Sequence, residues 1–245
     1  MKRILVILIP IFLFAGCKDM SYEIIVNGKV KTIIENIYAA TGTAEDPLKG
    51  SLVTEATMEF NKNGQIVSDT RTTYIGSNKL VVNTTYVYED GLLKVKQVSG
   101  TNYYKIVCEY DEDNNRIKES KFAGGSLDVK GDYYTMEYVK SEMTKKSHYN
   151  QINALLYVYN FTYDRDGNIS DMKTYNSTNA LISTTTYNYD SKGNIITQTE
   201  FDNSGTQTKK YSFIYTYGKK DNYTKQVILV NDNVSGITER EVTFY

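Results

Sequence analysis

The sequence predicts an all-β protein, an antiparallel meander of about 14–16 short strands in hairpin repeats. Two observations carry this prediction. A frame consisting of an aromatic residue followed by a turn recurs roughly every 26 residues, and the segments between turns alternate apolar with polar side chains. Residues 33–40 are ambiguous, but no other part of the mature chain shows clear helical periodicity. We therefore expect one sheet that curls into a flattened barrel or stays an open single-sheet shell.

The repeat is clearest when the chain is aligned on the aromatic residue that precedes each turn. We call these positions the repeat aromatics and the turns after them the repeat turns; the series is Phe60, Tyr88, Tyr110, Tyr138, Tyr163, Tyr189, Tyr217 and Tyr245. The turns share one theme, as in DRDGNI at 164–169 and DSKGNI at 190–195. Other turn-forming residues, such as NSTN at 176–179, lie about halfway between them. Each unit is thus predicted to be strand, turn, strand, turn, with about nine residues per strand.

Alternation along the strands separates a tyrosine face from a polar face. In residues 209–218, one face carries Tyr211, Phe213, Tyr215 and Tyr217. In residues 155–163, the matching face carries Leu155, Tyr157, Tyr159, Phe161 and Tyr163. The polar face carries Thr184, Thr186, Asn188, Gln198, Glu200, Lys210 and Ser212. Because these polar groups would be costly to bury without partners, we expect them to face water and the tyrosines to point inward.

The repeat turns resemble a cation site at first sight, because Asp164, Asp166 and Asn168 offer three oxygen ligands. An EF-hand loop also needs Gly at position 6 and Glu at position 12. Counted from Asp164, those positions hold Ile169 and Tyr175. A hairpin turn explains the frame better, since Asp or Asn can cap the turn and Gly or Asn can adopt its left-handed position. We predict structural turns at Asp164, Gly167, Asn168, Asp190, Gly193 and Asn194.

The N-terminus has the layout of a secretory signal peptide over residues 1–16, with a basic head and an apolar core. The apolar run followed by Ala-Gly-Cys resembles the lipobox of bacterial lipoproteins, which implies that Cys17 is acylated. We expect residues 17–27 to form a lipidated N-terminus and short tether, and residues 28–245 to form the repeat domain. The predicted location is the outer membrane, with the leaflet left open. The lipid is the predicted membrane partner.

The repeat itself resembles a known family. The pattern Y-D-x-x-G-N-I, present at 163–169 and 189–195, is similar to the tyrosine–aspartate (YD) repeat of RHS-type proteins. The likeness covers roughly residues 57–245, and two units match cleanly. Together with the lipobox, it resembles an uncharacterised group of bacterial outer-membrane lipoproteins with a porin-like β-fold. This implies the fold and the location, but it supplies no catalytic or binding residues.

An outer-membrane pore is an alternative for so many antiparallel strands. A barrel in lipid needs an apolar outer face and aromatic girdles near its two rims. Here the non-tyrosine face is polar, the phenols run along whole strands, and Trp is absent. The pattern therefore favours a barrel or shell that stands in water, although the pore stays open as an alternative.

Composition and the reactive residues argue against several function classes. A net charge of −1 does not favour nucleic acid. With Cys17 committed to lipid, Cys108 is expected to be a small buried hydrophobe. The single histidine, His148, is expected to be an exposed loop residue, and it offers neither a zinc site nor a catalytic triad. We expect a non-enzyme with no cofactor, no metal and no catalytic residue.

Three functions remain on the sequence alone. The favoured one is a non-catalytic binding module for an unknown glycan or peptide, because Tyr offers apolar area with a polar handle. The residues predicted to stack on such a ligand are Tyr157, Tyr159, Tyr211, Phe213 and Tyr215. The alternative is a structural or assembly lipoprotein that docks a protein partner through a sheet edge or face. A hydrolase is the third.

Overall fold

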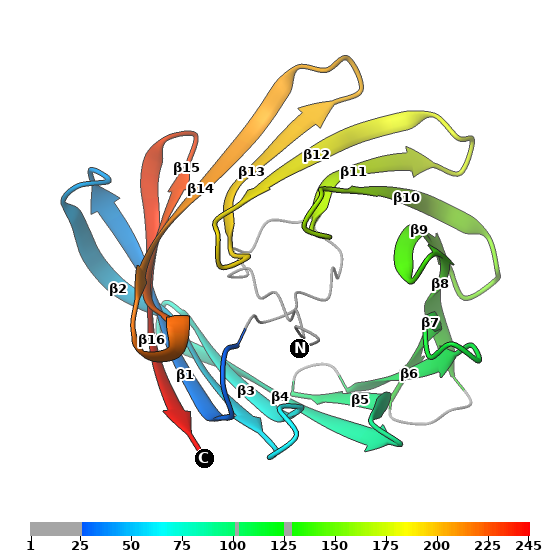
Figure 1. Ribbon diagram of the computed structural model, residues 1–245, viewed down its shortest axis with the longest axis horizontal. Helices are drawn as coiled ribbons and strands as arrows, with labels where there is room; N and C mark the ends of the chain where they lie inside the picture. Colours follow the sequence, from blue (N-terminus) through cyan, green and yellow to red (C-terminus); the bar gives the residue numbers. More distant parts are fainter. Residues whose placement is uncertain (1–25, 101–102, 125–128) are drawn as a thin grey trace.

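The computed structural model describes residues 26–100, 103–124 and 129–245. Within these ranges the chain forms sixteen antiparallel strands and one short 3-10 helix, and the sheet closes into a barrel (Figure 1). The strands are β1 Val30–Gly42, β2 Pro47–Phe60, β3 Ile66–Ile75, β4 Asn78–Glu89, β5 Leu92–Ser99, β6 Tyr104–Tyr110, β7 Arg116–Ala123, β8 Lys130–Val139, β9 Glu142–Tyr149, β10 Leu155–Tyr163, β11 Ile169–Asn176, β12 Leu181–Tyr189, β13 Ile195–Asp202, β14 Gln207–Tyr217, β15 Tyr223–Val230 and β16 Asn233–Phe244; the helix η1 is Lys219–Asp221.

Each strand pairs with its neighbours in the chain, and β1 pairs with β16 to close the ring. The predicted all-β meander is confirmed, and of the two predicted closures the structure adopts the barrel. The ambiguous residues 33–40 belong to β1. Since closure pairs both outer strands, the described sheet offers no free edge to which a partner could add a strand. Within the described residues, no helix is long and apolar enough to span a bilayer.

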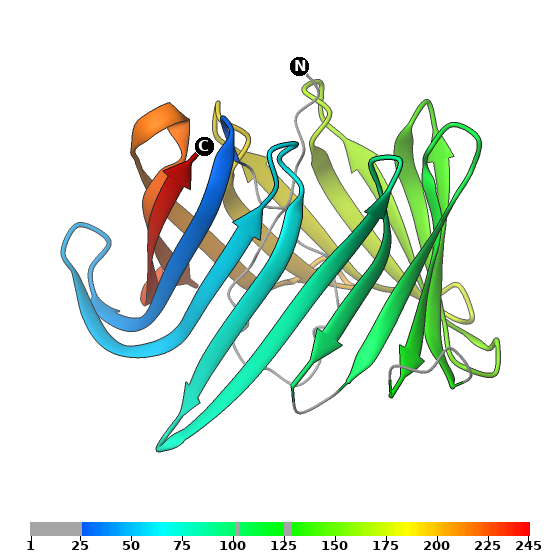
Figure 2. The same cartoon turned by 90° about the horizontal axis from the view of Figure 1, so that it is seen from below.

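The repeat turns all lie at one end of the barrel, which we call the repeat-turn end. Each even-numbered strand from β2 to β14 enters this end and each following odd-numbered strand leaves it, while the chain terminus at Tyr245 lies at the same end (Figure 2). The start of the described chain is held there too. Asn27 N–H donates to Asn222 Oδ1 at 3.0 Å, and Tyr245 N–H donates to the carbonyl of Lys29 at 3.0 Å.

A β-bulge interrupts the strand pairing at every internal repeat aromatic. The register shifts immediately before Phe60, Tyr88, Tyr110, Tyr138, Tyr163, Tyr189 and Tyr217. A bulge inserts one unpaired residue, so the ladder of backbone hydrogen bonds is broken locally. The sequence repeat is therefore a repeat of bulges as well as of turns.

Tyrosine hydroxyls satisfy the backbone at these bulges. Tyr189 donates to the carbonyl of Ile169, the first residue after the preceding repeat turn, at 2.9 Å. The repeat aromatics Tyr110, Tyr138 and Tyr163 make the same contact, at 2.8 or 2.9 Å, with Leu93, Arg116 and Met143. In the β14 unit it is made by Tyr215, two residues before the repeat aromatic Tyr217, with Ile195 at 2.9 Å. We call this series the tyrosine ladder. Each rung joins one hairpin unit to the unit before it, which explains a tyrosine at repeat positions 110, 138, 163 and 189.

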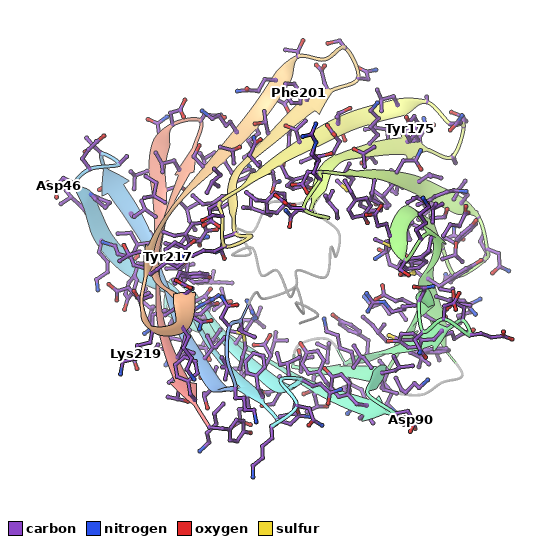
Figure 3. All side chains as sticks on the ribbon, in the orientation of Figure 1. Asp46, Asp90, Tyr175, Phe201, Tyr217 and Lys219 are labelled. Atoms are coloured by element: carbon purple, nitrogen blue, oxygen red, sulfur yellow. The ribbon has the colours of Figure 1, made fainter. Side chains whose placement is uncertain are left out.

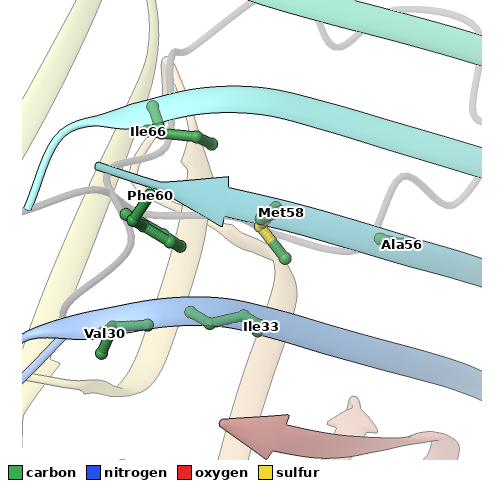
Figure 4. Close-up of a cluster of buried hydrophobic side chains, with 6 residues drawn as sticks. All are labelled: Val30, Ile33, Ala56, Met58, Phe60 and Ile66. Carbon is green, nitrogen blue, oxygen red and sulfur yellow. The ribbon is translucent and has the colours of Figure 1, made fainter. Parts of the chain in front are cut away.

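Two hydrophobic clusters lie on opposite sides of the wall. The first, on the inner side near the repeat-turn end, contains Val30, Ile33, Ala56, Met58, Phe60 and Ile66 (Figure 4). The second lies outside and contains Ala40, Val227, Leu229 and Ile237, with Ala44 of the β1–β2 turn packed against it. Bulges in the β1–β2 pair bend this hairpin, and its curved end is visible in Figure 2. The hairpin end thereby covers an apolar part of the outer surface.

Candidate binding site on the inner wall

Side chains project from both faces of the barrel wall (Figure 3), and burial identifies the inner face. On β14, Phe213 is 7% exposed, whereas its neighbour Ile214 is 46% exposed. On β10, Phe161 is buried, whereas Asn160 and Thr162 are exposed. The prediction that the tyrosine face points inward is confirmed for these strands.

On the strands that leave the repeat turns, the bulges change which side chains point into the barrel and which point out. After Tyr189, the inward side chains are Ile195 and then Gln198, three residues later, both less than a tenth exposed. Glu200 follows on the same face, paired with the buried Thr185, and accepts a hydrogen bond from Gln198 Nε2 at 3.2 Å. Our expectation that Gln198 and Glu200 face water was wrong, because strict alternation does not survive the inserted residue.

The five residues predicted to stack on a ligand all lie on this inner face, in two groups. Phe213 packs against Ile195 and Ile228. The Tyr215 hydroxyl donates a hydrogen bond to the Ile195 carbonyl and accepts one from Gln226 Nε2 at 3.0 Å. Phe213 is buried, and Tyr211 and Tyr215 are partly buried and pack against the same cluster. Tyr157 and Tyr159 on β10 are also partly buried. The four tyrosines of the set therefore retain some accessible ring surface.

His148 is not the exposed loop residue that we expected. It lies on β9, is 1% exposed, and its Nε2 lies 3.0 Å from Asp132 Oδ2. Strand pairing places it between Tyr134 of β8 and Tyr157 of β10, with ring centroids 4.5 and 6.1 Å away. The three rings form a row across the inner wall that continues to Tyr159. After the bulge at Tyr138, the inward residues on β9 are Met143, then Lys146 and His148, three and five positions later. The sequence alone did not reveal this spacing.

Cations gather on the inner wall over β5 to β9, where each lies on or beside a tyrosine ring. We call this area the basic wall; its cations are Lys94, Lys96, Arg116, Lys121 and Lys146. The ammonium groups of Lys94, Lys96, Lys121 and Lys146 lie 5.0, 6.0, 4.1 and 4.3 Å from the ring centroids of Tyr110, Tyr86, Tyr104 and Tyr134. These are cation–π distances. The arrangement arises because strands entering a repeat turn carry tyrosines inward and the next strand carries the cations.

Two of these cations share one carboxylate. Arg116 Nη1 and Lys146 Nζ lie 3.0 and 3.3 Å from the oxygens of Glu119. Burial alone would raise the pKa of Glu119, but the charges of Lys146 and Arg116 outweigh it and hold that pKa below its usual value. Asp132, beside His148, is the other acid that the described residues place in this area. The basic wall therefore keeps an excess of positive charge.

The inner wall at the β1–β16 seam is, in contrast, electrically balanced. Arg240 pairs with Glu35, and both side chains are almost fully buried. On β3, two strands from β1, Arg71 Nε lies 3.0 Å from Asp69 Oδ2. Among the described residues, the cited charges of this side are therefore paired, unlike those of the basic wall.

The carboxylates of Asp164 and Asp190 accept hydrogen bonds from backbone N–H groups of their own repeat turns. Asp164 Oδ1 accepts hydrogen bonds from the backbone N–H groups of Asp166 and Asn168, both at 2.9 Å. Hydrogen bonds from Asn168, aided by the other turn N–H groups, hold the pKa of Asp164 below its usual value. Asp190 makes the same contacts with Lys192 and Asn194, and Gly167 and Gly193 adopt positive φ in their turns. In the described ranges, no cluster of three His, Cys, Asp or Glu side chains is placed to hold a metal ion.

The remaining reactive residue is Cys108, which lies on the inner side of β6. It is 5% exposed, and burial raises the pKa of its thiol. The expectation of a buried small side chain is confirmed. Cys17, the predicted lipidation site, lies outside the described residues.

The outer wall carries both polar and apolar side chains: Ile34, Val87 and Ile214 are exposed there, and polar residues occupy mid-strand positions on β10 to β12. Asn160, Lys173 and Thr184 lie side by side on the outside of β10, β11 and β12. Nearer the repeat turns, Lys118 pairs with Glu109 and Lys145 pairs with Glu137, both at 2.7 Å. These outward pairs are substantially exposed.

The fold resembles that of a porin-like protein from Bacteroides uniformis, with 9% sequence identity, a TM-score of 0.58, and coverage of 89% of this chain and 98% of that one. A porin-like protein from Bacteroides vulgatus also matches, at 13% identity over 88% of this chain and 98% of that one, but with a TM-score of only 0.35. No protein-family model matches the chain, and neither does any curated protein. The first of these matches supports the β-barrel fold, and the resemblance to the tyrosine–aspartate repeat stays a prediction.

Proposed function

We propose that this protein is a lipid-anchored lipoprotein of the outer membrane whose barrel stands in water and binds a glycan on its inner wall without catalysis. The observation that carries the proposal is the set of partly exposed inner-face rings, above all Tyr157 and Tyr159. A sixteen-stranded barrel is wider than its side chains can fill, so such rings can be reached by a ligand. Within the described chain, opposite walls of the barrel make no substantial contact.

Side-chain recognition suits a glycan better than an extended peptide. Peptides often bind sheets by adding a strand to an exposed edge, where backbone hydrogen bonds supply the affinity. The closed barrel has no such edge in the described sheet. An assembly lipoprotein that docks its partner through a sheet edge is therefore not favoured. Ring stacking needs no edge, because Tyr presents a flat apolar surface with a polar hydroxyl.

The polar part of the outer wall, over β10 to β12, supports a barrel that meets water rather than lipid. A charged residue such as Lys173 at mid-strand would be costly on a lipid-facing surface. The ion pairs on the outer face, such as Lys145 with Glu137, point the same way. A protein of this kind needs a separate membrane attachment, which the lipid on Cys17 would provide.

Lipid attachment would also orient the barrel. Val26 is nine positions after Cys17, and an extended chain of that length spans at most about 30 Å. The described chain starts at the repeat-turn end, so this end would face the membrane and the opposite end would face away. Cys17→Ser should abolish labelling by radioactive palmitate, and continued labelling would contradict the anchoring.

A glycan array with the purified lipoprotein tests the binding proposal. We expect binding that Tyr157→Ala or Tyr159→Ala abolishes while the melting temperature changes little. Tyr175→Ala is the matched control, because Tyr175 lies on the outer face of β11. Capture of peptides in place of glycans, or equal loss of binding in the Tyr175 variant, would contradict the proposal.

A further inference from the structure

We propose that the basic wall makes the site selective for acidic oligosaccharides, with sugar rings against the tyrosines and negatively charged substituents at Lys94, Lys96 and Lys121. This inference rests on the proposed glycan binding and specifies its ligand class. It follows from the charge balance, the partners and the placement of these three lysines.

The charges of the basic wall are not balanced by the described residues. Within that part of the chain its five cations share the area with two carboxylates, and Glu119 is already held by Arg116 and Lys146. Asp132 lies against His148. Charges of one sign gathered in an enclosed surface raise the local concentration of ligands of the opposite sign.

Lys94, Lys96 and Lys121 are the cations left for a ligand. Among the described residues, none of the three has a carboxylate within ion-pair distance, although outward lysines such as Lys118 and Lys145 do. Each inward ammonium lies near a ring face instead. A ring holds the ammonium without neutralising its charge, so the charge remains available.

The spacing of these lysines fits an elongated ligand better than a single ion. Lys96 pairs with Ile106, and Ile106 pairs with Lys121, so the two lysines lie two strands apart on the same row. Strand spacing separates their backbones by about 10 Å. Lys94 and Lys96 are two residues apart along β5, about 7 Å. A chain of sugar rings that carries several acidic groups can contact all three, whereas one small anion cannot.

The composition of the wall also favours sugars over other polyanions. Aromatic rings alternate with the lysines along the wall, from Tyr86 and Tyr104 to Tyr110 and Tyr134. These rings supply apolar surface beside each positive charge. An acidic sugar ring offers both the flat apolar face and the anionic group that this alternation matches.

The test compares one oligosaccharide with and without its charge. The purified full-length lipoprotein is titrated calorimetrically with a hexagalacturonate, with its fully methyl-esterified form, and with a sulfated galactan hexamer. We expect the hexagalacturonate to bind at least about tenfold more tightly than its ester. Its affinity should fall as the salt concentration is raised. Tighter binding of the sulfated hexamer would also support an acidic ligand and would identify sulfate as the preferred group.

Charge variants locate the effect. Lys96→Gln and Lys121→Gln should each weaken acid binding about tenfold and leave ester binding unchanged. Lys118→Gln and Lys145→Gln, on the outer face, are the matched controls and should change neither.

Equal binding of acid and ester, or binding of neutral glycans alone on the array, would overturn the acidic class and leave the proposed glycan binding intact. Equal loss of acid binding in the outer-face controls would overturn the assignment to the basic wall. If no glycan of any kind binds, the proposed function and this inference both fail.

Discussion

Arg240 on the last strand donates from Nε and Nη2 to Glu35 Oε1 on the first strand, at 2.8 and 2.5 Å. The Tyr223 hydroxyl donates to the same oxygen at 3.1 Å, and the Arg240 guanidinium lies 3.5 Å from the Tyr223 ring centroid. The two partners are 205 positions apart in the chain. This buried pair therefore links the two strands whose meeting closes the barrel.

Removing one partner of this pair should be costly. Glu35→Gln leaves the Arg240 charge buried without its counter-ion, and we expect a loss of about 3–5 kcal/mol in the free energy of unfolding. Glu35→Met with Arg240→Met should recover most of that loss, because both charges are gone. Lys49→Gln removes the exposed Lys49–Glu239 pair and should cost at most about 1 kcal/mol. Urea titrations that show similar costs for Glu35→Gln and Lys49→Gln would contradict the role of the buried pair.

The same carboxylate predicts an acid limit to stability. Burial would raise the pKa of Glu35, but Arg240 outweighs it and lowers that pKa below its ordinary 4.5. The stabilisation is then fully present above pH 4.5 and is lost as the pH falls through the folded value. We expect unfolding free energies to decline below that pH, and to decline less steeply in Glu35→Gln. Parallel slopes for the two proteins would contradict this.

The tyrosine ladder should contribute through its hydroxyl groups. Tyr189→Phe keeps the ring and leaves the Ile169 carbonyl without its donor, which should cost about 1–2 kcal/mol. Tyr215→Ala removes a core ring as well and should cost about 3–5 kcal/mol. Tyr157→Ala, outside the ladder, should cost clearly less than Tyr215→Ala. Thermal melts of the three variants in one buffer measure this order, and an equal cost for all three would contradict the division into core and site.

The sequence predicted the repeat and its turns because both are local. The tyrosine-to-turn frame recurs along the chain, and Asp164 contacts residues only two to four positions away. The faces of the return strands were not predicted, because one inserted residue at each bulge exchanges them. A signal was nonetheless present: a polar or charged residue often follows the first return residue by three positions, as Asp69, Lys96, Glu119, Lys146 and Gln198 do.

Contacts between residues far apart in the chain could not be predicted from the sequence. Nothing local connects Glu35 with Arg240, so closure of the sheet could be stated only as one of two outcomes. The prediction that His148 is an exposed loop residue was wrong for the same reason. The burial of His148 depends on the bulge at Tyr138 and on rings from β8 and β10. Lys94, Lys96 and Lys121, which have no carboxylate within ion-pair distance in the described part of the chain, could be grouped only when neighbouring strands were placed in register.

Alkaline pH should weaken the barrel through its tyrosines. Burial raises the pKa of Tyr88, Tyr110 and Tyr163 to about 12, from an ordinary value of 10.0. Their neutral forms stabilise the folded state fully below pH 10, and that contribution is lost as the pH rises toward 12. We expect the melting temperature to fall over this range, with tyrosine ionisation followed by ultraviolet absorbance. Complete ionisation near pH 10 in the folded protein would contradict the burial of these rings.

The repeat turns should depend on backbone geometry and not on calcium. Gly167 has φ +82°, and a Cβ placed there would meet no atom within 4 Å. Gly167→Val should therefore cost about 1–3 kcal/mol through the backbone alone. Melts of the wild-type protein in calcium and in chelator should coincide. A clear rise in melting temperature with calcium would show that Asp164 and its neighbours bind the ion after all.

The central claim is that the polar outer wall meets water and the aromatic wall faces inward. Sedimentation velocity of the chain from residue 18 onward, in buffer without detergent, tests this most directly. We predict a soluble, folded species with a single sedimentation boundary and a β-type circular dichroism spectrum. A chain that aggregates in buffer and disperses only when detergent is added would contradict the claim and favour a membrane pore.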